Sequence, residues 1–260
     1  MLTFGPLGLG ALIGLVLGLL GGGGAILAVP GLVYVLGVDA HAAIAASLAI
    51  VAVGAITGLL THAAGGRVAW MVALQLGVTG AIGAWAGAAG GRLVPGEQLL
   101  AMLGLFMLVA AFLMVRRPTA DTPHAPSPRW LAPVLGVGIG ILTGFFGVGG
   151  GFLIVPALTL GLGLPIRLAI GTSLAVIAMN ALAGVAGYLG TGTVDWPLTL
   201  LVSAGAVGGA LVGGRLASRA PERQLRRGFA GLVALIAVFL IYRNAASWVA
   251  AIVLPLFDIH

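Results

Sequence analysis

The chain contains one glycine-rich segment twice, as Gly18-Leu-Leu-Gly-Gly-Gly-Gly-Ala-Ile-Leu-Ala-Val-Pro30 and, at an offset of 126 residues, as Gly144-Phe-Phe-Gly-Val-Gly-Gly-Gly-Phe-Leu-Ile-Val-Pro156. Both copies lie in apolar sequence, where a glycine cluster interrupts a helix. Inside a bilayer such an interruption is tolerated only where protein or a water-filled cavity covers the freed backbone groups. A pair of interruptions at matching positions of two halves therefore indicates a transport site.

The composition predicts an integral membrane protein. Of 260 residues, 60% are hydrophobic and only 7% are charged, and the mean hydropathy is +1.20. A soluble domain has roughly 25% charged residues. The absence of cysteine excludes disulfides, thiolate metal sites and thiol chemistry. We expect a multi-pass protein of the bacterial inner or plasma membrane, in which the net charge of +6 marks membrane orientation and not nucleic-acid binding.

The duplication extends far beyond the glycines. Matching tryptophan, serine, proline and glutamine residues recur without a gap, which indicates an internal structural repeat. The matched pairs include Ser47 with Ser173, Gly58 with Gly184, Trp70 with Trp196, Pro95 with Pro221 and Gln98 with Gln224.

Each repeat divides in the same way. Two short apolar pieces flank the glycines (6–20 and 25–37 in the first repeat, 132–146 and 152–164 in the second). Three runs of bilayer-spanning length follow, at 42–63, 68–91 and 98–115, and again at 168–190, 196–217 and 225–242. The predicted units are a first repeat (1–116), a cytoplasmic linker (117–130), a second repeat (131–243) and a C-terminal apolar tail (244–260).

The distribution of arginines decides how the short pieces run. If 6–37 were one broken span, the arginines would divide almost equally between the two sides of the membrane. If the two pieces instead form a hairpin that turns at the glycines, ten of the 12 basic residues fall on one side and only Arg92 and Arg243 on the other. The positive-inside rule favours the hairpin, with the linker inside the cell and both termini outside.

A hairpin followed by three spans inverts the second repeat relative to the first. We therefore predict an all-α polytopic membrane protein made of two inverted-topology repeats. Each repeat consists of a glycine-tipped, re-entrant helix hairpin and three transmembrane helices. The two tips would enter from opposite faces and meet near the midplane, which is the plan of inverted-repeat transporters.

The glycine tips suit an anion. The helices that follow them begin near Ala25 and Phe152, and a helix N-terminus presents unpaired N–H groups with a partial positive charge. The alternative is that glycine here only permits close helix packing. We assign that role to six other glycines, namely Gly80, Gly83, Gly87, Gly205, Gly208 and Gly209. Neither cluster is a phosphate-binding P-loop, because no Lys-Ser/Thr pair follows it.

Three motifs of the second half together resemble the TauE/SafE sulfite exporter family: Gly147-Val-Gly-Gly-Gly-Phe-Leu-Ile-Val-Pro156, Ala169-Ile-Gly-Thr-Ser-Leu174 and Gly192-Thr-Val-Asp-Trp196. The resemblance covers nearly the whole chain. It implies a polytopic carrier of small sulfur-containing anions such as sulfite, sulfoacetate or related organosulfonates. In the first half, alanines replace Gly171 and Thr172, so the two half-sites are not equivalent.

Polar residues within the predicted spans are further candidates. Ser47 and Ser173 are a symmetric pair, and Asn180 lies two helical turns beyond Ser173. The alternatives are that the hydroxyls bond to carbonyls of their own helices and that Asn180 bonds to another helix. His62 and Tyr188 fit gating or interface anchoring as well as ligand contact. The candidate substrate-binding residues are Gly22, Gly23, Gly24, Ala25, Ser47, Gly149, Gly150, Gly151, Phe152, Thr172, Ser173 and Asn180.

All six acidic residues fall in or beside predicted loops, so coupling through a membrane carboxylate lacks a residue. We expect export of a small sulfur-containing oxyanion, with no catalytic residue, metal or cofactor and with the bilayer as the other partner. An anion channel of the same architecture is the alternative. An intramembrane enzyme is disfavoured because no nucleophile–base pair is evident. The sequence leaves a homodimer open, and also whether 245–257 spans the membrane.

Overall fold

The computed structural model of the chain is almost entirely helical. It describes residues 4–91, 93–95, 98–99, 102–106, 108–109, 112, 131–146, 151–188, 194–221, 224–225, 227–228 and 231–242. The predicted linker and C-terminal tail lie outside these residues, and so do Gly149 and Gly150.

The described helices are, in chain order, α1 (Phe4–Leu20), α2 (Gly23–Pro30), the π-helical turn η1 (Gly31–Val35), α3 (Ala40–Ala63), α4 (Trp70–Gly91), α6 (Leu131–Phe146), α7 (Gly151–Pro156), the π-helical turn η2 (Ala157–Gly161), α8 (Ile166–Tyr188) and α9 (Trp196–Arg219). A further apolar helix covers Gly231–Tyr242. Among the described residues, α3, α4, α8 and α9 are long and apolar enough to cross a membrane. The predicted helical membrane protein is therefore confirmed.

The chain reverses direction at the first glycine cluster. Gly21 has a left-handed backbone (φ 66°), which glycine adopts without steric cost, and α2 begins two residues later. From there α2 runs back along α1, because Gly24 lies against Leu17 and Gly31 lies against Leu9. This is the reversal that the arginine distribution favours.

Both repeats end the returning piece in the same way. α2 and α7 each end on a proline, and a π-helical turn follows. The N–H of Leu36 donates to the Gly31 carbonyl (3.3 Å), and the N–H of Leu162 donates to the Ala157 carbonyl (3.1 Å). Left-handed glycines then stop both segments, at Gly37 (φ 69°) and Gly163 (φ 68°).

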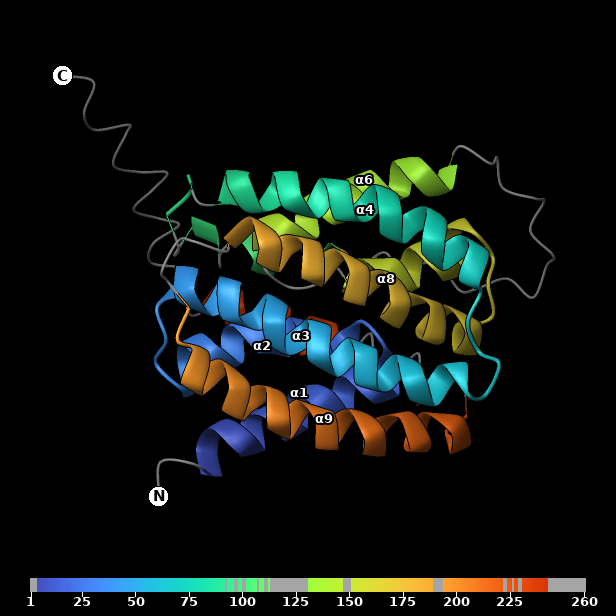
Figure 1. The fold of residues 1–260 in the computed structure, drawn as a ribbon, viewed down its shortest axis with the longest axis horizontal. Helices are drawn as coiled ribbons and strands as arrows, with labels where there is room; N and C mark the ends of the chain where they lie inside the picture. Colours follow the sequence, from blue (N-terminus) through green and yellow to red (C-terminus); the bar gives the residue numbers. More distant parts are fainter. Residues whose placement is uncertain are drawn as a thin grey trace.

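Two helix pairs form the outer sides of the molecule, α1 with α9 and α4 with α6 (Figure 1). A side chain on Gly14 of α1 would overlap the backbone of Ala206 in α9, and a side chain on Gly140 of α6 would overlap the backbone of Gly80 in α4. The two contacts are equivalent at the offset of 126. Small residues permit this backbone approach between membrane helices. Each hairpin is thus held by the other repeat.

One predicted packing glycine is not in such a contact. Gly205 and Gly209 face the backbone of α1, at Leu7 and Ala11. Gly208 is exposed, and nothing lies within 4 Å of the position that its side chain would take. The packing role expected for Gly208 is therefore wrong. The reason is that it lies on the face of α9 that turns away from α1.

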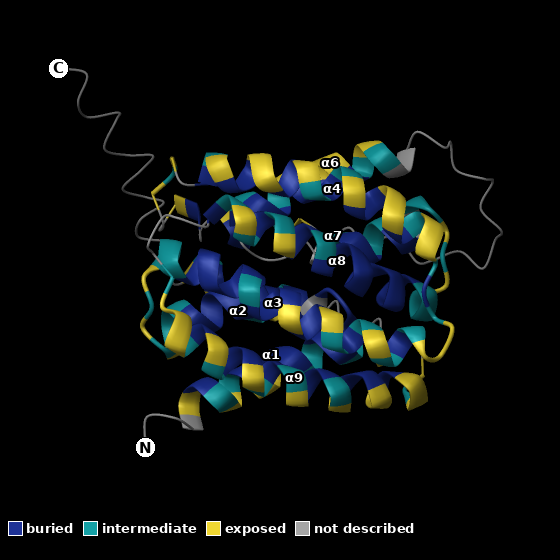
Figure 2. Cartoon of the chain, in the orientation of Figure 1, coloured by how far each residue is buried: buried dark blue, intermediate teal, exposed yellow. Residues whose placement is uncertain are grey.

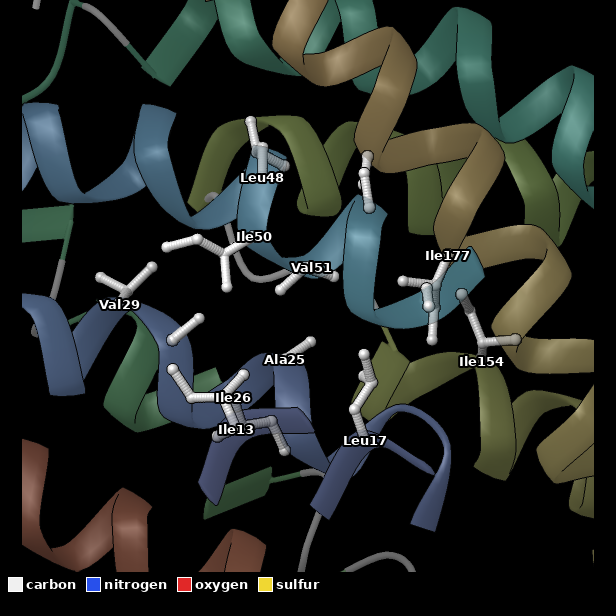
Figure 3. Packing of buried hydrophobic residues seen from close by; sticks show 14 of the residues in the cluster. Ile13, Leu17, Ala25, Ile26, Val29, Leu48, Ile50, Val51, Ile154 and Ile177 are labelled. Carbon is white, nitrogen blue, oxygen red and sulfur yellow. The ribbon is translucent and has the colours of Figure 1, made fainter. Parts of the chain in front are cut away.

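The centre of the molecule is the crossing of α3 and α8. Over an apolar stretch of 18 residues, 67% of the residues of α3 and 72% of those of α8 are buried, against 44% for α4 and for α9. Figure 2 shows the same difference in burial between the central and the outer helices. Gly58 of α3 lies against Leu174 of α8, and Leu48 lies against Gly184. The two helices therefore run antiparallel. Apolar side chains of both helices join those of α1, α2 and α7 in one core (Figure 3).

We predict that Gly14→Leu lowers the melting temperature of the detergent-solubilised protein. Overpacking a tight interface costs about 1–3 kcal/mol, and here the obstacle is backbone at Ala206, which cannot rotate away. Gly208→Leu is the matched control, because that position is open. Equal melting temperatures for the two variants would contradict the described packing of α1 on α9.

Candidate functional site

The start of α2 is buried and has no side-chain cap. Gly22 is the N-cap residue, and no side chain caps the first turn. Gly22, Gly24 and Ala25 are buried. The first N–H groups of a helix have no partner within the helix, and together with the helix dipole they favour an anion. Gly22 is thus the N-cap of α2, and Gly23, Gly24 and Ala25 form its first turn; their predicted contact with an anion stays a prediction.

The tip of the first repeat lies against α8 of the second. A side chain on Gly21 would come within 2.7 Å of the Ser173 hydroxyl oxygen and 3.2 Å of the Ile170 carbonyl oxygen. Ser173 is fully buried, and its hydroxyl donates to that same carbonyl at 2.8 Å. The hydroxyl therefore makes the local bond that was the alternative to ligand binding. Its oxygen can still accept a hydrogen bond.

Thr172 fixes the start of α4 beside this tip. Its hydroxyl oxygen accepts a hydrogen bond from the Ala69 N–H at 2.9 Å, and the Thr172 side chain is buried. The neighbouring Gly171 lies against the Arg67 carbonyl and against the side chain of His62. The segment 170–173 of α8 is therefore enclosed between the first tip and the connection from α3 to α4.

His62 joins α3 to the same tip. Its Nε2 lies 3.1 Å from the carbonyl oxygen of Gly18, and because a carbonyl only accepts, the ring donates Nε2–H. The side chain is 1% exposed, and Nδ1 has no partner among the described residues. We define the first-tip cluster as Gly21, Gly22, His62, Thr172 and Ser173.

The structure does not bring Ser47 to this cluster. Its hydroxyl donates to the Ile44 carbonyl at 2.7 Å, as Ser173 does to Ile170. Leu48, next to Ser47, lies at Gly184, whereas Leu174, next to Ser173, lies at Gly58. Leu48 and Gly58 are ten residues apart on α3, roughly 15 Å at 1.5 Å per residue. The antiparallel crossing thus separates the two serines.

The other candidates lie elsewhere. Gly151 and Phe152 are the first two residues of α7, and Gly149 and Gly150 before them are outside the described residues. Asn180 is fully buried beside Gly80 of α4, and within the described part of the chain neither polar atom of its amide has a partner. It lies seven residues along α8 from Ser173, roughly 10 Å away.

Three groups near the tip are missing from the sequence prediction. The Gly18 carbonyl and the Ala69 N–H are backbone groups with no residue-type signal. Arg67 is assigned from sequence only to membrane orientation, yet its carbonyl lies against Gly171 and its guanidinium donates to the Thr61 carbonyl at 3.4 Å. Over the described residues, no group of three His, Asp or Glu side chains is placed to hold a metal ion.

Comparison with known proteins gives a consistent family match. The model of the sulfite exporter TauE/SafE family matches residues 7–240. A probable membrane transporter protein of Xylella fastidiosa is 39% identical over 253 residues, which are 94% of this chain and 97% of the relative. The probable membrane transporter protein YdhB of Bacillus subtilis is 30% identical over 221 residues, 83% of this chain and 90% of the relative. No solved structure matches the chain.

We predict that Thr172→Val lowers the melting temperature, because the Ala69 N–H loses its acceptor. A lost hydrogen bond of this kind costs about 1 kcal/mol. Thr172→Ser retains the hydroxyl and should preserve the wild-type value. A valine variant as stable as the wild type would show that Thr172 does not hold the start of α4.

Proposed function

The chain belongs to the sulfite exporter TauE/SafE family of membrane transporters, and on that premise we propose that it exports a small sulfur-containing oxyanion such as sulfite, sulfoacetate or a related organosulfonate. The observation that carries the proposal is the buried, uncapped start of α2 in contact with Ser173. Backbone N–H groups and hydroxyls hydrogen-bond an oxyanion without a buried side-chain charge, whose desolvation would be costly.

We further propose that the halves are inverted-topology repeats with re-entrant hairpins. Support comes from α3 and α8, which are equivalent at the offset of 126. The contact of Gly58 with Leu174 becomes the contact of Gly184 with Leu48 when the repeats are exchanged. Because the two helices are antiparallel, the two-fold axis that exchanges them runs perpendicular to the helices, in the plane of the membrane. This is the symmetry of inverted-repeat transporters.

Each half-site then combines the tip of one repeat with a serine of the other. In the first, the anion accepts hydrogen bonds from the first turn of α2, at Gly22, Gly23, Gly24 and Ala25, and from Ser173, whose hydroxyl turns from the Ile170 carbonyl to the anion. Thr172 holds the enclosing segment. In the second, Ser47 takes the place of Ser173, with Gly151 and Phe152 at the start of α7 and Gly149 and Gly150 before them in the sequence. Asn180 lies between the two serines along α8 and offers an amide N–H to an anion in passage.

The membrane potential supplies the driving force in this proposal. An inside-negative potential favours outward movement of an anion by about 2.3 kcal/mol per charge per 100 mV. Asp39 and Asp195, the acidic residues that the structure describes, are N-caps of α3 and α9 and lie outside the spans. Neither is placed to carry a proton across the membrane.

Ser173→Ala should reduce sulfite or sulfoacetate flux in proteoliposomes by about tenfold or more, since a hydrogen bond to a charged group contributes roughly 1.5–3 kcal/mol. The melting temperature should change little, because the hydroxyl bonds only to a carbonyl of its own helix. Ser47→Ala is the matched variant, with the same local bond. Wild-type flux in both variants would remove the hydroxyls from the site.

Clamping the membrane potential tests the driving force and the mode of transport. We expect sulfite efflux to rise with an inside-negative potential at equal pH on both sides, and to saturate with counterflow. Flux that ignores the potential and requires a pH gradient would contradict the proposal. Single-channel currents would identify the alternative, an anion channel of the same architecture.

A further inference from the structure

A cavity of about 420 Å³ lies beside the first tip, at the end of the molecule that carries Arg67, Arg167, Arg215 and Arg219. This end is called the arginine end below. Among the described residues, the lining is apolar apart from Arg219 and Gln224, and it includes Leu19, Leu20, Leu216 and Leu225. The volume lies within the range of about 300–1,000 Å³ that is typical of ligand pockets.

At the repeat-equivalent positions, three residues of the cavity lining are replaced by larger side chains. At the offset of 126, Leu19 and Leu20 correspond to Phe145 and Phe146. The Phe146 ring stacks on Phe106 with centroids 6.2 Å apart and meets Phe145 edge-on at 5.0 Å. Gly228, which lines the cavity, corresponds to Met102.

Two charged positions near the cavity also differ between the repeats. Arg215 and Arg219 are exposed on the last turns of α9, and their counterparts are Ala89 and Leu93. Arg167 donates to the Ser218 and Ala220 carbonyls, each at 3.0 Å, and so holds the end of α9 at the rim of the cavity. The cavity and these arginines therefore occur at the same end of the molecule.

We propose that this cavity is a binding site for an anionic phospholipid, with an acyl chain among the leucines and the headgroup phosphate at Arg219. A small inorganic anion is a poor occupant, because the leucines offer no hydrogen bond to replace its water. A neutral lipid satisfies the apolar lining but not the arginine. Basic pockets between helices on the cytoplasmic side suit anionic headgroups, and the positive-inside rule places the arginine end there.

The occupant would also support the transport site. Leu19 and Leu20 directly precede the left-handed Gly21, which lies on Ser173. An acyl chain against these leucines would hold the tip from the side opposite α8. Lipid binding itself needs no transported anion, so it is measured independently of the proposed function.

The experiment measures lipid retention by native mass spectrometry of the full-length protein purified in detergent, with phosphatidylglycerol and phosphatidylcholine added at equal concentration. We expect about fivefold more bound phosphatidylglycerol, since one arginine near the surface attracts an anionic lipid by roughly that factor. Arg219→Gln should abolish the preference. Arg215→Gln, which removes the same charge from an exposed residue that does not line the cavity, should retain it.

A second variant tests the cavity and not the charge. Leu20→Phe with Gly228→Met introduces the larger side chains of the repeat-equivalent positions, Phe146 and Met102, and it should reduce retention of both lipids while the melting temperature is maintained. Equal retention of the two lipids by the wild type would overturn the proposal. An equal loss of the lipid preference in the Arg215 and Arg219 variants would also overturn it, because that result would indicate general attraction to a charged surface. Unchanged lipid retention in the Leu20→Phe, Gly228→Met variant would overturn it as well.

Discussion

The close approach of glycine-bearing helices is the constraint on which the rest of this structure depends. α1 lies on α9 at backbone distance because Gly10, Gly14 and Gly18 present no side chain to it. The same spacing recurs between α6 and α4. A bilayer gives no hydrophobic drive for helices to associate, so such packing has to supply the attraction. As a result each hairpin packs on helices of the other repeat, and the first glycine tip meets Ser173 and not its own Ser47.

The antiparallel crossing of α3 and α8 then determines how the polar groups are distributed. It places Ser47 and Ser173 toward opposite ends of the molecule, so one chemical motif is used twice, at two places. The surroundings of the two serines differ in polarity. Around the first tip, Thr172 and His62 make hydrogen bonds to the backbone. The residues at their repeat-equivalent positions are Ala46 and Tyr188. The first-tip cluster is therefore the richer in hydrogen-bonding side chains, although most of its side chains come from outside the repeat that forms the tip.

The sequence predicts the frame of this molecule better than its contacts. Hydropathy and the offset of 126 locate the helices, and the arginine distribution indicates the reversal at Gly21, because each depends on residue type along the chain. The serine that each tip meets depends on how helices of one half pack on helices of the other. The hydrophobic pattern of the sequence does not reveal this packing. The bond from His62 to Gly18 involves a backbone carbonyl and has no sequence signal. Gly208 is the opposite case: the sequence predicts that it packs against another helix, but in the structure it faces away from α1.

Sequence divergence between the repeats has changed the side chains at the two ends of the molecule more than the arrangement of its helices. At each end a cationic or polar side chain from the start of a central helix bonds to a carbonyl that precedes a proline. His41 meets the Val94 carbonyl at 3.1 Å, and its equivalent Arg167 meets the Ala220 carbonyl at 3.0 Å. Arginine has a second donor for the Ser218 carbonyl and always carries a charge. The same connection is thus retained at both ends, and the arginine end also carries Arg215, Arg219 and the apolar cavity. The two repeats therefore keep the same connection at the start of their central helices with side chains of different chemistry.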